Sequence, residues 1–97
     1  MTYTLNIDKP ALTLLKKLPA DIQRLLIEKA QVLKTNPHAG LPLKGKYRLL
    51  RSLHLNLKGT AYRIIYQVFE RSEMIVIRLG ARRENIYRRL DTMKLNP

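Results

Sequence analysis

The chain has 97 residues, of which 45% are hydrophobic, so it can build one modest core and has no room for a second domain. It contains no cysteine and only two histidines, which excludes a disulfide framework and a thiolate metal site and argues against a histidine metal cluster. Nineteen Lys and Arg against seven Asp and Glu give a formal charge of +12, which predicts a polyanionic partner.

The N-terminal segment predicts a strand followed by a short helix. Residues 2–7 alternate apolar and polar side chains, the pattern of a strand with one buried face. Asp8 can cap a helix, Pro10 is tolerated in its first turn, and Pro19 interrupts it. Apolar side chains recur between the prolines at helical spacing, at Ala11, Leu14, Leu15 and Leu18.

A second helix is predicted after Pro19, with Asp21 in its first turn, and should form a hairpin with the first. Its apolar stripe comprises Ile22, Leu25, Leu26, Ala30 and Leu33. Asn36 and Pro37 form the stop signal. Residues 36–46 contain two prolines and two glycines, so we expect a loop there.

Three strands are predicted in the second half of the chain. Residues 52–57, 62–68 and 74–79 alternate in the period-two pattern. The connections at residues 58–60 and 70–73 are short enough for hairpins, so the three strands should form an antiparallel meander. Gly80 is expected to end it, a short helix to follow over residues 84–90, and the basic tail to Pro97 is assigned no regular structure.

This order of elements predicts an α+β domain over residues 1–97, with the helical hairpin on one face of the sheet and the other face left for function. If the leucines of residues 53–57 face the helices, then His54, Asn56, Arg63 and Arg78 project from the opposite face. Tyr62 and Tyr66 share the parity of Ile64 and Val68, and are expected in the core.

The charge is concentrated in the C-terminal part of the chain. Residues 1–40 carry six basic and three acidic side chains, whereas residues 41–97 carry thirteen and four. None of the common phosphate-loop, dinucleotide, nucleophile-elbow or zinc motifs is present. The remaining side chains suit phosphate chemistry without a metal or other cofactor. The longest apolar runs are far shorter than the ~20 residues of a membrane span, so no membrane association and a cytoplasmic location are expected.

Four segments, at residues 15–19, 43–45, 62–68 and 79–87, occur in an order and spacing that resemble the RelE/ParE toxin superfamily. The resemblance covers nearly the whole chain and implies a RelE-like microbial RNase fold. For the RelE branch it implies the toxin of a type II toxin-antitoxin system, a ribosome-dependent endoribonuclease. Such a toxin cuts messenger RNA in the ribosomal A site and so inhibits translation.

The resemblance also implies the chemistry and the partners. The substrate's own 2′-hydroxyl is the nucleophile, so the reaction needs a base, an acid and positive charge at the phosphate, but no cofactor. The implied partners are the ribosome with its messenger RNA and an acidic, RelB-like antitoxin. Operator DNA would be contacted only indirectly, through the antitoxin complex.

Residue by residue, Arg63 matches the family's phosphate-contacting arginine and Arg82 its second arginine, for which Arg83 is a substitute. Tyr87 matches a C-terminal tyrosine that stacks on a base or transfers a proton, although its spacing from Gly80 is one residue shorter. His54 is the candidate base, because its ordinary pKa near ~6.5 suits neutral pH.

The chain departs from the family pattern on the strand of residues 52–57, where His54 and Asn56 replace two lysines. The assignment of acid and base therefore stays open, and Lys58 or Arg51 is a candidate for the displaced charge. Five residues are expected to contact RNA or the ribosome: Arg48, Arg51, Lys58, Arg78 and Arg83. The plainer interpretation of each is a solvated or packing side chain.

Two other functions remain open. A ParE-like protein would share the fold but bind and inhibit DNA gyrase without cutting RNA, and would not need a phosphate clamp at the centre of the sheet. A non-catalytic RNA-binding protein would explain the charge but not the spacing of the motifs.

Overall fold

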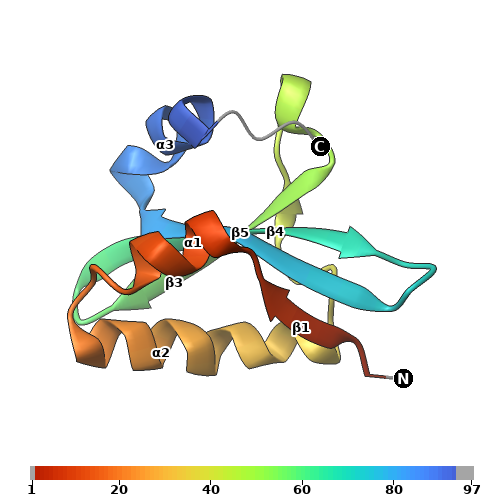
Figure 1. The fold of residues 1–97 in the computed structure, drawn as a ribbon, viewed down its shortest axis with the longest axis horizontal. Coiled ribbons are helices and arrows are strands. Elements are labelled where there is room, and N and C mark those ends of the chain that lie inside the picture. The colour runs from red at the N-terminus through yellow and green to blue at the C-terminus, as the bar shows by residue number, and fades with distance from the viewer. Residues whose placement is uncertain (1, 94–97) are drawn as a thin grey trace.

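A five-stranded mixed sheet in the order β1-β5-β4-β3-β2 forms the centre of the computed structural model, which describes residues 2–93 (Figure 1). Its strands are β1 (Thr4–Ile7), β2 (Leu41–Pro42), β3 (Leu50–Leu57), β4 (Thr60–Phe69) and β5 (Met74–Arg82). The helices are α1 (Lys9–Leu15), α2 (Ala20–Ala30) and α3 (Ile86–Met93), with 3-10 turns η1 (Gln31–Lys34), η2 (Gly45–Tyr47) and η3 (Arg83–Asn85). The expected α+β class is confirmed.

The antiparallel meander of β3, β4 and β5 is confirmed, and two strands extend it. β1 pairs in parallel with β5, and β2 pairs with the start of β3 inside the segment that the sequence indicated as loop. The β3–β4 turn places Lys58 and Gly59 at φ of 50° and 80°, the left-handed conformation that a two-residue hairpin turn requires. Lys58 also forms an ion pair with Asp21 of α2.

The first core lies between the sheet and the two N-terminal helices, as expected. Asp8 caps α1 by accepting a hydrogen bond from the backbone N–H of Ala11 at 3.1 Å. The apolar stripes of α1 and α2 pack against the leucines of β3 and the buried Tyr62 and Tyr66 of β4. The assignment of both tyrosines to the core is confirmed.

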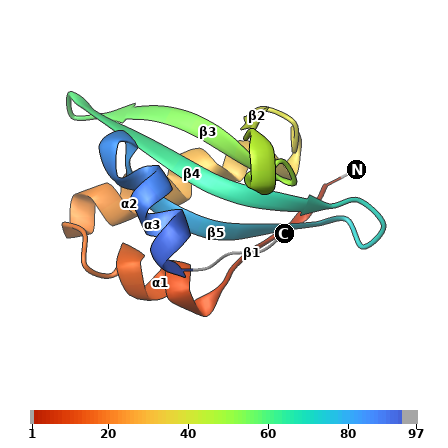
Figure 2. The same ribbon diagram turned by 90° about the horizontal axis from the view of Figure 1, so that it is seen from above.

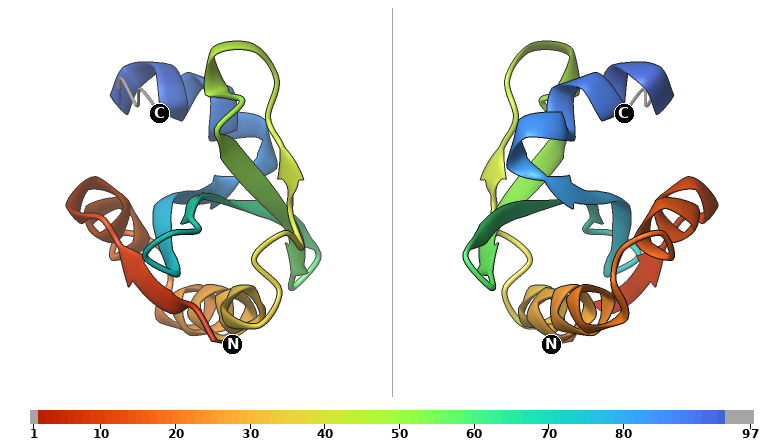
Figure 3. Two further views of the ribbon diagram at one scale, coloured as in Figure 1. Left: turned by 90° about the vertical axis from the view of Figure 1, so that its right-hand side faces the viewer. Right: turned by 90° about the vertical axis from the view of Figure 1, so that its left-hand side faces the viewer.

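The opposite face of the sheet is partly covered, which corrects the expectation of an open face. In the views of Figures 2 and 3, α3 crosses this face, beside the segment that contains η2. A second apolar cluster lies beneath them, formed by Leu43, Tyr47, Leu50, Ile65, Leu79, Ala81, Ile86 and Leu90. The hydroxyl of Tyr47 donates a hydrogen bond to Asp91 and so joins the two coverings.

A bulge in β5 reverses the orientation of the end of that strand. Ile65 pairs with Leu79 but Tyr66 pairs with Ile77, so Arg78 is an extra residue without its own partner in β4. Ile77 therefore packs in the first core and Leu79 in the second. The expected alternation over residues 74–79, which would place Ile77 and Leu79 on one face, was therefore wrong at its end, because the sequence pattern does not reveal an inserted residue.

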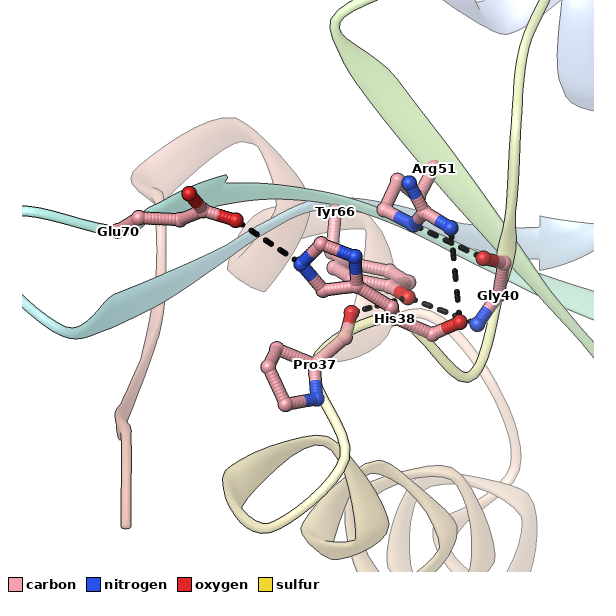
Figure 4. A network of polar contacts seen from close by, with 6 residues as sticks. All are labelled: Pro37, His38, Gly40, Arg51, Tyr66 and Glu70. Atoms are coloured by element: carbon pink, nitrogen blue, oxygen red, sulfur yellow. Dashed lines mark hydrogen bonds and ion pairs between the residues drawn. The ribbon is translucent and has the colours of Figure 1, made fainter. Parts of the chain in front are cut away.

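A network of hydrogen bonds fixes the loop before β2 against the sheet (Figure 4). The hydroxyl of Tyr66 donates to the carbonyl of Pro37 at 2.8 Å and accepts from the N–H of Gly40 at 2.9 Å. Arg51 donates from Nε to the carbonyl of Gly40 at 2.9 Å. A Cβ on Gly40 would lie 2.7 Å from the backbone oxygen of Ser52, so only glycine fits this approach.

The C-terminal elements differ in their bounds from the expectation. Gly80 does not end the meander: it pairs with Ile64, and β5 continues to Arg82. The final helix begins at Ile86 after a 3-10 turn and runs to Met93, while residues 94–97 of the expected tail lie outside the described residues. None of the helices within residues 2–93 is long and apolar enough to cross a membrane.

Candidate active site

His54 and Arg63 are direct cross-strand partners in the β3–β4 hairpin. Their neighbours Leu53 and Ile64 pack in the first core, so both polar side chains project from the opposite face. Asn56 lies on the same face, two residues along β3 from His54. The expectation that these three residues project together is confirmed by this register.

One donor of the Arg63 side chain, its Nε, is buried and has no hydrogen-bond partner among residues 2–93. Leaving a buried donor unpaired costs about 1–3 kcal/mol, more for a charged group, so such a donor in a native structure calls for an explanation. A bound anion would satisfy it.

The pKa of the His54 imidazole lies below its ordinary value of 6.5. Partial burial is the largest cause, and the positive charges of Arg63 and then Arg83 add to it. Each of these causes disfavours the protonated ring. His54 is therefore neutral at pH 7 and has a free nitrogen lone pair to accept a proton.

Arg82 and Arg83 leave the end of β5 in different directions. Arg82 pairs with Tyr62, whose side chain faces the first core, so Arg82 projects from the face opposite to Arg63. Arg83 starts η3 and is near enough to His54 to lower its pKa. The structure thus brings Arg83 and not Arg82 together with His54 and Arg63, because the bulge reverses the parity of the last residues of β5.

Tyr87 is half exposed in the first turn of α3, between Ile86, which is buried in the second cluster, and the exposed Arg88. Such a position suits a ring that stacks on a ligand entering from solvent.

Three of the expected RNA-contacting side chains are held by the protein itself. Arg51 donates to the carbonyl of Gly40, and Lys58 is paired with Asp21. Arg78 donates from Nη1 to Gln67 at 2.8 Å. Its Nε lies 2.7 Å from Oδ2 of Asp8, but the N–H is not aligned for a hydrogen bond, so that contact is an ion pair. Arg78 is on the expected face, because Gln67 pairs with Leu50 of the second cluster, but its guanidinium contacts Gln67 and Asp8 rather than Arg63 or His54.

Arg48 is exposed at the end of η2, where its backbone N–H donates to the carbonyl of Gly45. Arg48 thus belongs to the segment that covers part of this face of the sheet.

Ser52 is a residue of this face that the sequence analysis did not single out. It shares the parity of His54, two residues away, and its hydroxyl is buried with no hydrogen-bond partner among the described residues. It lines a cavity of about 220 Å³ with Ala39, Leu41, Leu53 and His54, at the point where β2 ends. Parity alone would have indicated its face, but its burial depends on β2, which the sequence did not predict.

The family model that describes the ParE-like toxin of type II bacterial toxin-antitoxin systems matches residues 5–91 of the chain. A search of curated proteins with the sequence of this chain found no match.

Several solved structures share the fold. The toxin-antitoxin complex RelBE2 from Mycobacterium tuberculosis contains a chain that is 28% identical, with a TM-score of 0.74 and coverage of 86% of this chain and 93% of that one. A mutant of the Escherichia coli toxin RelE in the free state is 23% identical, with a TM-score of 0.74 and coverage of 98% and 100%. The archaeal RelE-RelB complex from Pyrococcus horikoshii is 25% identical, with a TM-score of 0.59 and coverage of 86% and 97%.

Proposed function

The chain belongs to the ParE-like toxin family of type II bacterial toxin-antitoxin systems, and we propose that it is a ribosome-dependent endoribonuclease that cuts messenger RNA in the ribosomal A site. The observation that carries this proposal is the pairing of His54, with its lowered pKa, and Arg63, with its buried and unsatisfied Nε, on adjacent strands. A base next to a fixed positive charge is what cleavage at a phosphodiester needs.

The proposed reaction assigns one role to each group. The neutral imidazole of His54 takes the proton of the substrate's 2′-hydroxyl, whose oxygen attacks the adjacent phosphorus. Arg63 and Arg83 bind the non-bridging oxygens as negative charge develops on them. The bond from phosphorus to the 5′-oxygen then breaks, giving a 2′,3′-cyclic phosphate and a 5′-hydroxyl.

The proton for the departing 5′-oxygen is assigned to Tyr87 or to water. Tyr87, half exposed at the rim of α3, can donate from its hydroxyl or stack on the neighbouring base. A tyrosine hydroxyl and a neutral imidazole can both transfer protons without a metal ion. Among residues 2–93 there is also no group of three or more acidic or histidine side chains placed to hold a metal ion.

An acidic antitoxin is the proposed regulatory partner. Two of the similar structures are RelE or RelBE toxins in complex with their antitoxins, and the charge of +12 on this chain is complementary to an acidic protein. A segment of the antitoxin that lies over His54 and Arg63 would block access of the message to both.

The test is to incubate the purified protein with ribosomes programmed with a defined message and to map cuts by primer extension, with a DNA gyrase supercoiling assay in parallel. We expect cuts within the A-site codon and unchanged supercoiling. Arg63→Ala should slow cutting by roughly 100-fold or more, whereas Arg24→Ala, which removes an exposed charge from α2, should not slow it. Intact message together with inhibited supercoiling would instead establish the gyrase-binding alternative.

A further inference from the structure

A basic hollow of about 200 Å³ lies beside the outer edge of β5, away from the His54 and Arg63 pair. It is bounded by the end of α1 and the turn after it, by the last residues of β5, and by η3 and α3. In Figures 2 and 3, α1 and α3 flank this end of β5. Its lining residues are Leu14, Lys17, Leu18, Gly80, Ala81, Arg82, Asn85 and Arg89.

Three cations from three separate elements line this hollow and are almost without counter-charge. Lys17 and Arg89 form no ion pair within residues 2–93, and Arg82 has only Glu84, at 3.9 Å. The Arg82 and Glu84 side chains are both more than half exposed, so this pair contributes little. Asn85 accepts a hydrogen bond from Arg88 through its carbonyl oxygen, which leaves its amide N–H groups as donors.

Like charges that gather around a hollow repel each other, and that repulsion is relieved when an anion binds between them. The volume is below the about 300–1,000 Å³ typical of sites for whole drug-sized ligands, so it suits a single compact group. We infer that Lys17, Arg82 and Arg89 bind a phosphate of the RNA backbone at a second site, distinct from the site of cleavage.

This inference rests on the proposed function and extends it, because it gives the RNA a second point of attachment. Arg82 and Arg83 are consecutive but serve the hollow and the cleavage site respectively. A strand whose scissile phosphate lies at Arg63 would therefore cross η3 to reach the hollow. Phosphate contacts of this kind fix position and register rather than sequence.

The experiment measures binding separately from cleavage. A fluorescein-labelled single-stranded 2′-O-methyl RNA, which lacks the nucleophilic hydroxyl, is titrated with the protein, and anisotropy is followed at several salt concentrations. The variant is Lys17→Ala with Arg89→Ala. The matched control is Arg24→Ala with Lys29→Ala, which removes the same charge from exposed positions of α2. Circular dichroism verifies that both fold.

We expect the Lys17→Ala, Arg89→Ala variant to bind the RNA more weakly than the parent protein. A plot of the logarithm of its binding constant against the logarithm of salt concentration should be less steep, by about 0.7 for each lost phosphate contact on a single strand. The control variant should behave like the parent. Equal slopes for the two double variants would overturn the inference, whether or not the parent cuts message on ribosomes. The inference would also be overturned if the Lys17→Ala, Arg89→Ala variant kept the salt dependence of RNA binding but lost binding to poly-L-glutamate. That result would identify an acidic protein surface as the occupant of the hollow.

Discussion

His54 and Arg63 oppose each other in register across β3 and β4, and the guanidinium helps to keep the imidazole unprotonated. A base works only when deprotonated, so cleavage should fall as pH drops through the pKa of His54. Because that pKa is lowered, the midpoint of the fall should lie below pH 6.5. Single-turnover cleavage on programmed ribosomes, measured across pH, gives this profile.

Arg83→Ala sharpens this prediction, because it removes one cause of the lowered pKa. The pKa of His54 should rise toward its ordinary value, and the acid limb of the rate profile should shift to higher pH. An NMR titration of the His54 ring measures the same shift in pKa independently of any cleavage assay. The Arg82→Ala variant should leave that titration unchanged, and an equal shift in both variants would refute the placement of Arg83.

Arg63→Ala should separate activity from stability. The cleavage rate should drop by roughly 100-fold or more, the scale seen when one donor to the transition state is lost. The free energy of unfolding should change by no more than about 1 kcal/mol, since the mutation removes a buried donor that has no partner in the fold. Chemical denaturation, run in parallel with the cleavage assay, measures the change in stability. The Arg63→Lys variant then shows whether a positive charge without the planar guanidinium is enough for cleavage.

The loop before β2 should depend on the Tyr66 hydroxyl. Tyr66→Phe leaves the buried N–H of Gly40 and the carbonyl of Pro37 without their partner, which should cost about 1–3 kcal/mol in the free energy of unfolding. Gly40→Ala should cost at least as much, because its Cβ would meet the backbone of Ser52. Tyr62→Phe, in the same core, is a control that loses a tyrosine hydroxyl outside this network.

Unlike Tyr66→Phe, Ser52→Ala should not lower the free energy of unfolding. The Ser52 hydroxyl is buried without a hydrogen bond, so its removal should leave the protein as stable or make it more stable by up to about 1–3 kcal/mol. A urea midpoint clearly below that of the parent would mean that the hydroxyl has a stabilising partner after all.

Cleavage should not require a divalent metal held by the protein. The proposed groups at the site are an imidazole and two guanidiniums, with no carboxylate among them. Naked RNA, used to avoid the metal requirement of the ribosome itself, should be cut poorly with or without EDTA. Efficient cutting that EDTA abolishes would contradict the proposed mechanism.

The sequence predicted the elements that depend on local periodicity. The alternation in β3 and β4 gave the correct faces for His54, Asn56 and Arg63, because side chains alternate strictly along a regular strand. The N-terminal strand and the helical hairpin followed from spacing and from the caps at Asp8 and the prolines.

Features set by long-range pairing were missed. β2 has two residues and forms only because β3 lies beside it, so it leaves no periodic signal. The second apolar cluster joins residues from four separate segments, and its covering of the sheet followed from no single pattern. The sequence around Arg78 follows the period-two pattern of a regular strand, so the bulge is visible only in the register between β5 and β4.

That bulge means that one inserted residue decides which arginine meets the substrate. If the same residues paired without the bulge, the register beyond Ile77 would shift by one, which would turn Arg82 toward the face of Arg63 and move Ala81 out of the second cluster. Among related toxins, equivalent arginines are therefore better matched by their cross-strand partner in β4 than by their distance along the chain from the preceding glycine.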